Sequence, residues 1–91
     1  MIKEDIENNL KTSLDVIFLE VINESNTHNV PDGAESHFKI TIVSDIFEDM
    51  RPVQRHQKIY EILKVEMKKI HAIAIHPYTT NEWKDISGED L

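Results

Sequence analysis

The sequence predicts an α+β domain with the element order αββαβα, and two patterns establish most of this order. Near the start of the chain, apolar residues recur every four positions, as on one face of a helix: Ile2, Ile6, Leu10 and Leu14. Three later segments, 16–24, 37–44 and 71–78, are rich in β-branched or apolar residues, and segment 37–44 alternates apolar with polar side chains. This composition is typical of strands.

A second helix is predicted between the last two strands. Pro52 suits the first turn of a helix, where the N–H that proline lacks would have no partner in any case. From there, apolar positions continue at spacings of three and four and predict an apolar face about five turns long: Val53, His56, Tyr60, Leu63, Met67 and Ile70. Thr79 and Glu82 have the spacing of a capping box, which predicts a short last helix carrying Trp83.

The connections between these elements predict the sheet. A helix that joins strands 37–44 and 71–78 makes them parallel, with a right-handed crossover. Strands 16–24 and 37–44 are joined by a loop of about ten residues and are expected to be antiparallel. The prediction is therefore a three-stranded mixed sheet with helices on one face, in a single domain over residues 1–86. Residues 87–91 are expected to form a disordered tail.

Composition restricts the class of protein. The chain has 91 residues, no cysteine and a net charge of −7, so any metal chemistry has to use imidazole or carboxylate ligands. No stretch approaches the ~18 apolar residues of a membrane span, and the first residues are too acidic for a targeting segment. The sequence predicts a cytoplasmic domain that does not bind membranes. It contains no nucleophile–base pair, P-loop or metal-hydrolase motif, so an enzyme is not expected.

One segment of this acidic chain is basic. Residues 51–69 have a net charge of +4, which leaves −11 for the remainder. Such a segment suits a phosphate backbone or an acidic partner, although a solvated helix face is the alternative interpretation. The candidate phosphate-binding residues are Arg51, Arg55, Lys58, Lys64, Lys68 and Lys69.

The five histidines are the candidate ligands. His56 lies on the apolar arc of the second helix and is expected to be a hydrogen-bonded core or cap residue, and His76 is expected to be structural. His71, as the first residue of its strand, can turn outward, and His28 lies in the long loop. His37 is either a further ligand or a loop anchor. Two imidazoles are too few for a closed zinc site, but they suffice as half of an iron–sulfur coordination sphere. A partner-independent zinc or copper site is the other alternative.

Short blocks of residues spread over 1–86 also occur in the order typical of one family. The blocks are Phe18-Leu19-Glu20-Val21, Ser25 with His28, Pro31-x-Gly33-x-Glu35-Ser36-His37-Phe38-Lys39, Val43-Ser44-Asp45-x-Phe47, Gln54-Arg55-His56, Ile59-Tyr60, His71-Ala72 and Glu82-Trp83. In these blocks the chain resembles the BolA family. The resemblance implies a type II KH-like fold with the order αββαβ.

The resemblance also implies partners and a cofactor. Family members pair with monothiol glutaredoxins and share a [2Fe–2S] cluster, for which the glutaredoxin supplies a cysteine and a glutathione thiolate. By position, the matching ligands here are His71 and His28, with His37 as an alternative to His28. The isolated chain is expected to hold no cluster tightly and to be a monomer or weak dimer. Some members are DNA-binding transcription regulators, which agrees with the basic segment. The GxxG loop of KH domains is missing, so RNA binding of that kind is not expected.

Overall fold

The computed structural model of the protein describes residues 1–25 and 35–87. Its helices and strands confirm the predicted order αββαβα, with two added 3₁₀ turns. The elements are α1 (Ile2–Ser13), β1 (Phe18–Asn23), β2 (His37–Val43), η2 (Asp45–Phe47), α2 (Pro52–Ile62), η3 (Glu66–Lys68), β3 (Ala72–Tyr78) and α3 (Thr80–Ser87).

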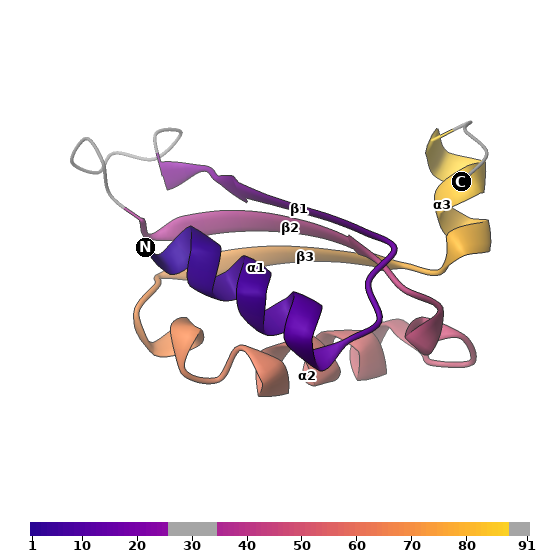
Figure 1. Ribbon diagram of the computed structural model, residues 1–91, viewed down its shortest axis with the longest axis horizontal. Helices are drawn as coiled ribbons and strands as arrows, with labels where there is room; N and C mark the ends of the chain where they lie inside the picture. The colour runs from indigo at the N-terminus through magenta and orange to yellow at the C-terminus, as the bar shows by residue number, and fades with distance from the viewer. Residues whose placement is uncertain (26–34, 88–91) are drawn as a thin grey trace.

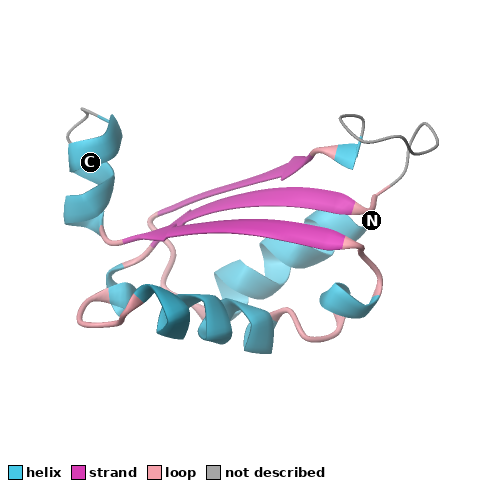
Figure 2. Ribbon diagram, turned by 180° about the vertical axis from the view of Figure 1, so that it is seen from behind, coloured by secondary structure: helices cyan, strands magenta, loops and turns pink. Residues whose placement is uncertain are grey.

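The sheet has the predicted mixed topology. Its strand order is β1-β2-β3, with β1 antiparallel and β3 parallel to β2. Helices α1 and α2 cover one face of this sheet (Figure 1). Helix α3 lies apart from them at one end, while the start of β2 and the start of β3 lie at the other end (Figure 2). The face opposite α1 and α2 is called the open face below.

The core fills the layer between the sheet and the two helices. Strand β2 alternates, so Phe38, Ile40 and Ile42 point toward the helices and are buried. They pack against Ile6 and Leu10 of α1. The remaining buried members of this cluster are Leu14, Val21, Phe47, Ile59, Leu63 and Ile75. Alternation thus leaves the other side chains of β2 on the open face.

Helix α2 is shorter than the sequence predicts. It ends at Ile62, where Leu63 adopts φ −93° and ψ 20°, and only the 3₁₀ turn η3 follows before β3. The predicted five-turn apolar face is therefore wrong in extent. Val53 and Tyr60 lie on the predicted face but are exposed, whereas Ile59 and Leu63 are fully buried. The chain has to turn back toward the start of β3, and this turn ends the helix.

The start of α1 is fixed by a carboxylate from a distant part of the chain. Glu35, two residues before β2, accepts hydrogen bonds from the backbone N–H groups of Ile2 (3.4 Å) and Lys3 (3.3 Å). These N–H groups have no partner within the helix, and the positive end of the helix dipole favours a negative charge there. Glu35 thereby joins the beginning of the chain to the segment that leads into β2.

Helix α3 is capped as the sequence predicts. The backbone N–H of Thr79 donates to Glu82 (2.8 Å), and the backbone N–H of Glu82 donates to the Thr79 hydroxyl (3.2 Å). Trp83 stacks on Phe18 with ring centroids 5.3 Å apart and contacts Tyr78 at 5.6 Å. No residue of α3 is buried. The helix is therefore held at the end of the open face by this aromatic cluster, a hydrogen bond from the Thr80 N–H to Asp45 and an ion pair to α2.

The outer edge of β3 faces α2. In a parallel ladder, alternate residues direct their backbone groups away from the neighbouring strand, and here these residues include Ile75 and Pro77. The Ile75 carbonyl lies 3.2 Å from His56 Nε2, and the Pro77 carbonyl accepts from Arg55 Nη1 at 3.4 Å. Side chains of α2 thus lie within hydrogen-bond distance of both carbonyl groups. Within the described ranges 1–25 and 35–87, no helix has the length and apolar character needed to cross a membrane.

Candidate metal-ligand site

Two of the five histidines lie side by side at the end of the sheet opposite α3. His37 is the first residue of β2, and His71 immediately precedes β3, whose first residue Ala72 pairs with His37. Because the two strands are parallel, both imidazoles emerge at the same end. Their ring centroids are 5.2 Å apart, with an interplanar angle of 50°. His71 is exposed and His37 is half-buried.

A shallow hollow of about 220 Å³ lies beside His37. Its lining includes Ala72 and Ala74, whose small side chains leave room on the sheet surface next to the imidazole. The other lining residues are Glu24, Phe38 and Ile73. The hollow gives a bound group or a partner access to the sheet beside His37.

Ser36 holds the two histidines in their places. Its carbonyl accepts hydrogen bonds from the backbone N–H groups of both His71 (2.8 Å) and Ala72 (3.1 Å). Its hydroxyl lies 2.9 Å from Nδ1 of His37. The residue before β2 therefore contacts one imidazole directly and fixes the backbone of the other.

Ser25 lies behind Ser36 and is almost fully buried, with 1% of its surface exposed. Its hydroxyl oxygen accepts from the backbone N–H groups of Ser36 (2.9 Å) and His37 (3.1 Å). In the sequence, Ser25 and Ser36 belong to the family blocks, but no role is predicted for either residue. No local pattern reveals that residues eleven positions apart bond to each other, because the pairing depends on how β1 and β2 align.

The other histidines have separate environments. His56 has Nδ1 2.8 Å from the Pro52 carbonyl and Nε2 3.2 Å from that of Ile75, which confirms the prediction of a hydrogen-bonded histidine. His76 is half-buried within β3, opposite Thr41 of β2. His28, a predicted ligand, lies outside the described residues.

The described histidines do not by themselves form a complete metal site. Across residues 1–25 and 35–87, no group of three or more His, Cys, Asp or Glu side chains is arranged to hold a metal ion. His37 and His71 are two imidazole donors, the ligand type that suits zinc, copper and iron. A metal centre here needs further ligands from elsewhere, and the exposed position of His71 leaves it accessible to a second molecule.

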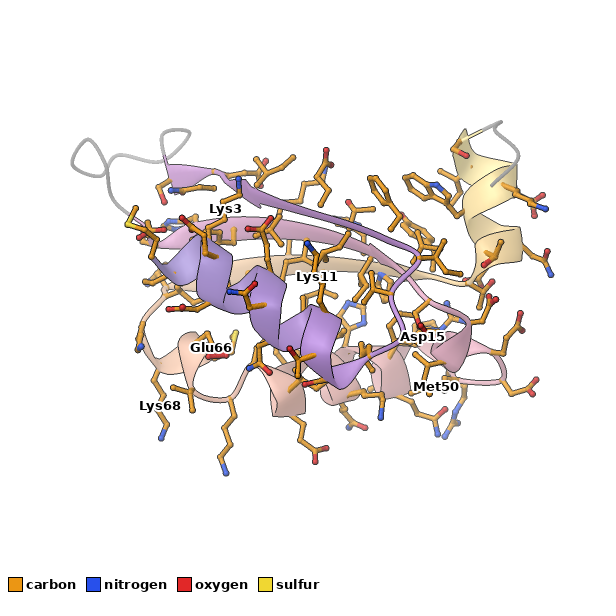
Figure 3. All side chains as sticks on the ribbon, viewed as in Figure 1. Lys3, Lys11, Asp15, Met50, Glu66 and Lys68 are labelled. Atoms are coloured by element: carbon orange, nitrogen blue, oxygen red, sulfur yellow. The ribbon has the colours of Figure 1, made fainter. Side chains whose placement is uncertain are left out.

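The predicted phosphate-binding residues are spread over several elements. Arg51 precedes α2, Lys58 belongs to α2, and Lys64 follows it. Lys68 belongs to η3, with Lys69 just after it, and Lys68 points away from the body of the protein (Figure 3). They therefore do not share one helix face.

Two residues of this segment are engaged within the fold. Arg55 binds Glu82, and only 11% of its side chain is exposed. Glu66 is buried and accepts a hydrogen bond from the Asn9 amide at 2.8 Å. Of the predicted phosphate-binding residues, Arg51, Lys64, Lys68 and Lys69 are exposed.

Comparison with known proteins places this chain in one family. The family model described as BolA-like protein matches residues 10–82. The chain is 50% identical to the DNA-binding transcriptional regulator BolA of Vibrio cholerae over 90 residues, which cover 98% of this chain and 85% of that one. Its fold is similar to the solution structure of BolA1 from Mus musculus, with a TM-score of 0.86 and 38% identity. The match covers 98% of this chain and 73% of the mouse chain. The BolA domain of SufE1 from Arabidopsis thaliana matches with a TM-score of 0.81 and 38% identity. This match covers 88% of this chain and 93% of that domain.

Proposed function

Since the chain belongs to the BolA-like protein family, we propose that it is a non-enzymatic adaptor that shares a [2Fe–2S] cluster with a monothiol glutaredoxin. His71 supplies one ligand, and His28 or His37 supplies the second. The glutaredoxin supplies its cysteine and a glutathione thiolate. The complex serves iron–sulfur trafficking or iron sensing.

The observation that supports this proposal is the exposed imidazole of His71 beside His37. The pair offers nitrogen donors at an accessible end of the sheet, and iron–sulfur centres accept two histidines on one iron. The chain has no thiolate of its own, so the sulfur ligands of the other iron have to come from the partner. An open half-site is what a cluster shared between two proteins requires.

The test reconstitutes the cluster between the two proteins. The purified chain is mixed with a monothiol glutaredoxin and glutathione, iron and sulfide are added anaerobically, and visible absorption and circular dichroism are recorded. We expect a spectrum distinct from that of the glutaredoxin alone, lost in His71→Ala. His76→Ala is the matched control, because it removes a β3 imidazole away from the site. An unchanged spectrum in His71→Ala would overturn the proposal.

The same mixture identifies the second ligand. His28→Ala and His37→Ala are compared under identical conditions, and the variant that alters the spectrum marks the ligand. Because Ser36 lies against His37, a change confined to circular dichroism intensity indicates a positioning effect of His37. Loss of the shared spectrum indicates coordination.

A DNA-binding regulator is the second candidate function. The Vibrio cholerae relative is named as one, and this chain exposes Lys64, Lys68 and Lys69 around η3. Lysine–phosphate contacts position a protein on DNA, and their affinity falls steeply with salt. We expect Lys64→Glu with Lys68→Glu to weaken DNA binding and reduce its salt dependence. Lys11→Glu on α1 serves as the control. Equal binding by all variants would exclude this surface.

A further inference from the structure

The peptide unit between Ser36 and His37 is held from both sides. A peptide bond is planar, and in the trans form its C=O and N–H point in opposite directions. The C=O of this unit, from Ser36, accepts from the N–H groups of His71 and Ala72. The N–H of the same unit, from His37, donates to the Ser25 hydroxyl at 3.1 Å.

Ser25 therefore controls the orientation of this peptide plane. Its hydroxyl also accepts a hydrogen bond from the preceding N–H, that of Ser36, at 2.9 Å. Ser25 therefore binds two consecutive peptide units. Rotation of the plane would break the bond to Ser25 on one side and move the acceptor of His71 on the other. The bonds to His71 and to Ser25 are thus mechanically linked through one rigid group.

We propose that Ser25 is a positioning residue for His71, acting through the peptide plane of Ser36 and His37. The proposal takes from the proposed function only the ligand role of His71. Ser25 itself touches no ligand. It fixes the Ser36 carbonyl, which fixes the backbone from which the His71 imidazole extends, and it fixes the strand start that carries His37.

Because Ser25 is buried, its hydroxyl is not easily replaced as the acceptor of these two N–H groups. With 1% of the residue exposed, water has little access to replace the hydroxyl oxygen. Removing that oxygen takes away the acceptor of two partly buried N–H groups, and a donor that loses its acceptor away from water carries a desolvation penalty. The peptide plane can relieve this cost by rotating toward another acceptor, which displaces the Ser36 carbonyl.

Ser44 provides a matched control at the opposite end of β2. It is also fully buried, and its hydroxyl donates to the Asp15 carbonyl (2.7 Å) and accepts from the N–H of Ile46 (3.3 Å). Ser25→Ala and Ser44→Ala each delete one buried hydroxyl that makes two backbone hydrogen bonds. Their general effect on stability is therefore comparable, whereas only Ser25 is connected to His71.

The experiment measures amide hydrogen exchange in the free chain. We expect the His71 and Ala72 amides to exchange about tenfold faster in Ser25→Ala, and to stay within about twofold of wild type in Ser44→Ala. Ser25→Thr keeps the hydroxyl and is expected to restore slow exchange. If Ser25→Ala does not fold, Ser25→Cys gives the same comparison, because sulfur is a weak acceptor of similar size. Unchanged exchange of both amides in the variant would overturn the proposal.

A second measurement separates this proposal from the proposed function. The glutaredoxin mixture described above is repeated with Ser25→Ala and Ser44→Ala, and circular dichroism of the shared cluster is compared. We expect an altered signal only in Ser25→Ala. If the wild-type chain forms no shared cluster, the proposed function fails, while the exchange result still decides the role of Ser25.

Discussion

Arg55 and Glu82 form two parallel hydrogen bonds, of 2.6 Å and 3.2 Å, between α2 and the first turn of α3. The guanidinium also donates through Nε to the Met50 carbonyl at 3.0 Å. A bidentate guanidinium–carboxylate pair fixes both distance and orientation. Since α3 buries no residue of its own, this pair, the Trp83 stack and the hydrogen bond from the Thr80 N–H to Asp45 (3.0 Å) hold the helix in its position.

The pair predicts a pH dependence of stability. The Arg55 guanidinium, together with the Thr79 backbone N–H, holds the pKa of Glu82 below its ordinary value of 4.5. The stabilisation is therefore complete above that ordinary value and is lost as the pH falls through the lowered pKa. Because 45% of the Glu82 side chain is exposed, solvent screening limits its size to less than about 1 kcal/mol.

Urea unfolding of wild type and Glu82→Gln, between about pH 6 and about pH 3, measures this effect. We expect the difference in unfolding free energy between the two proteins to shrink as the pH falls. Protonation makes Glu82 uncharged, as glutamine is at every pH. A difference that stays constant over this range would contradict the prediction. Asp85→Asn, on the same helix but outside the capping box, is the control.

The aromatic cluster predicts that α3 detaches before the core unfolds. Trp83 is the only tryptophan, so its fluorescence reports the stack with Phe18 without interference. We expect its emission to shift to longer wavelength at a lower urea concentration than the loss of helical circular dichroism. Phe18→Ala should widen this separation, because an aromatic pair contributes about 1 kcal/mol beyond its buried area.

Ile22→Ala is the control for the stack. Ile22 lies on the same strand and the same face as Phe18 and has similar exposure, but it pairs with Lys39 toward the far end of the sheet. We expect it to leave the fluorescence transition where it is in wild type. Coincident fluorescence and circular dichroism transitions in every variant would show that α3 unfolds together with the core.

Helix α2 offers a direct test of which apolar positions form the core. Ile59→Ala should reduce the free energy of unfolding by about 2–5 kcal/mol, because the side chain is fully buried against the sheet. Val53→Ala on the same helix should change it by less than about 0.5 kcal/mol, since 56% of the residue is exposed. Chemical denaturation measures both values, and equal losses would contradict the observed orientation of the helix.

His56 is predicted to contribute stability and no coordination. Replacing it with alanine removes the imidazole contacts to the carbonyls of Pro52 and Ile75. This should lower the free energy of unfolding by about 1–3 kcal/mol. The shared cluster spectrum with a glutaredoxin should remain that of wild type. Loss of that spectrum in a folded His56→Ala protein would contradict this separation of roles.

The sequence was sufficient for element order and sheet topology because those follow from local patterns. Alternation placed Phe38, Ile40 and Ile42 on one face, and the helical crossover made β2 and β3 parallel. The end of α2 was not predictable in the same way. Tyr60 continues the apolar spacing but is exposed, because the position of the sheet beneath the helix decides which apolar residues are covered.

The candidate site was predictable in its residue types and only partly in its geometry. The strand position of His71 indicated an outward imidazole, and His71 is exposed. That His37 lies against it depends on the register between β2 and β3, which no short pattern specifies. The engagement of Arg55 by Glu82 likewise joins residues 27 positions apart, so the basic segment alone overstated the free positive charge.

Pro77 affects how copies of this protein associate at high concentration. An exposed strand edge invites pairing with a strand of a second molecule, which is a common start of aggregation. On the outer edge of β3, Pro77 has no N–H to offer, and the carbonyls of Pro77 and Ile75 are already occupied by Arg55 and His56. Intermolecular growth of the sheet is therefore discouraged along β3, and solubility there depends on the same α2 side chains that hold the fold together.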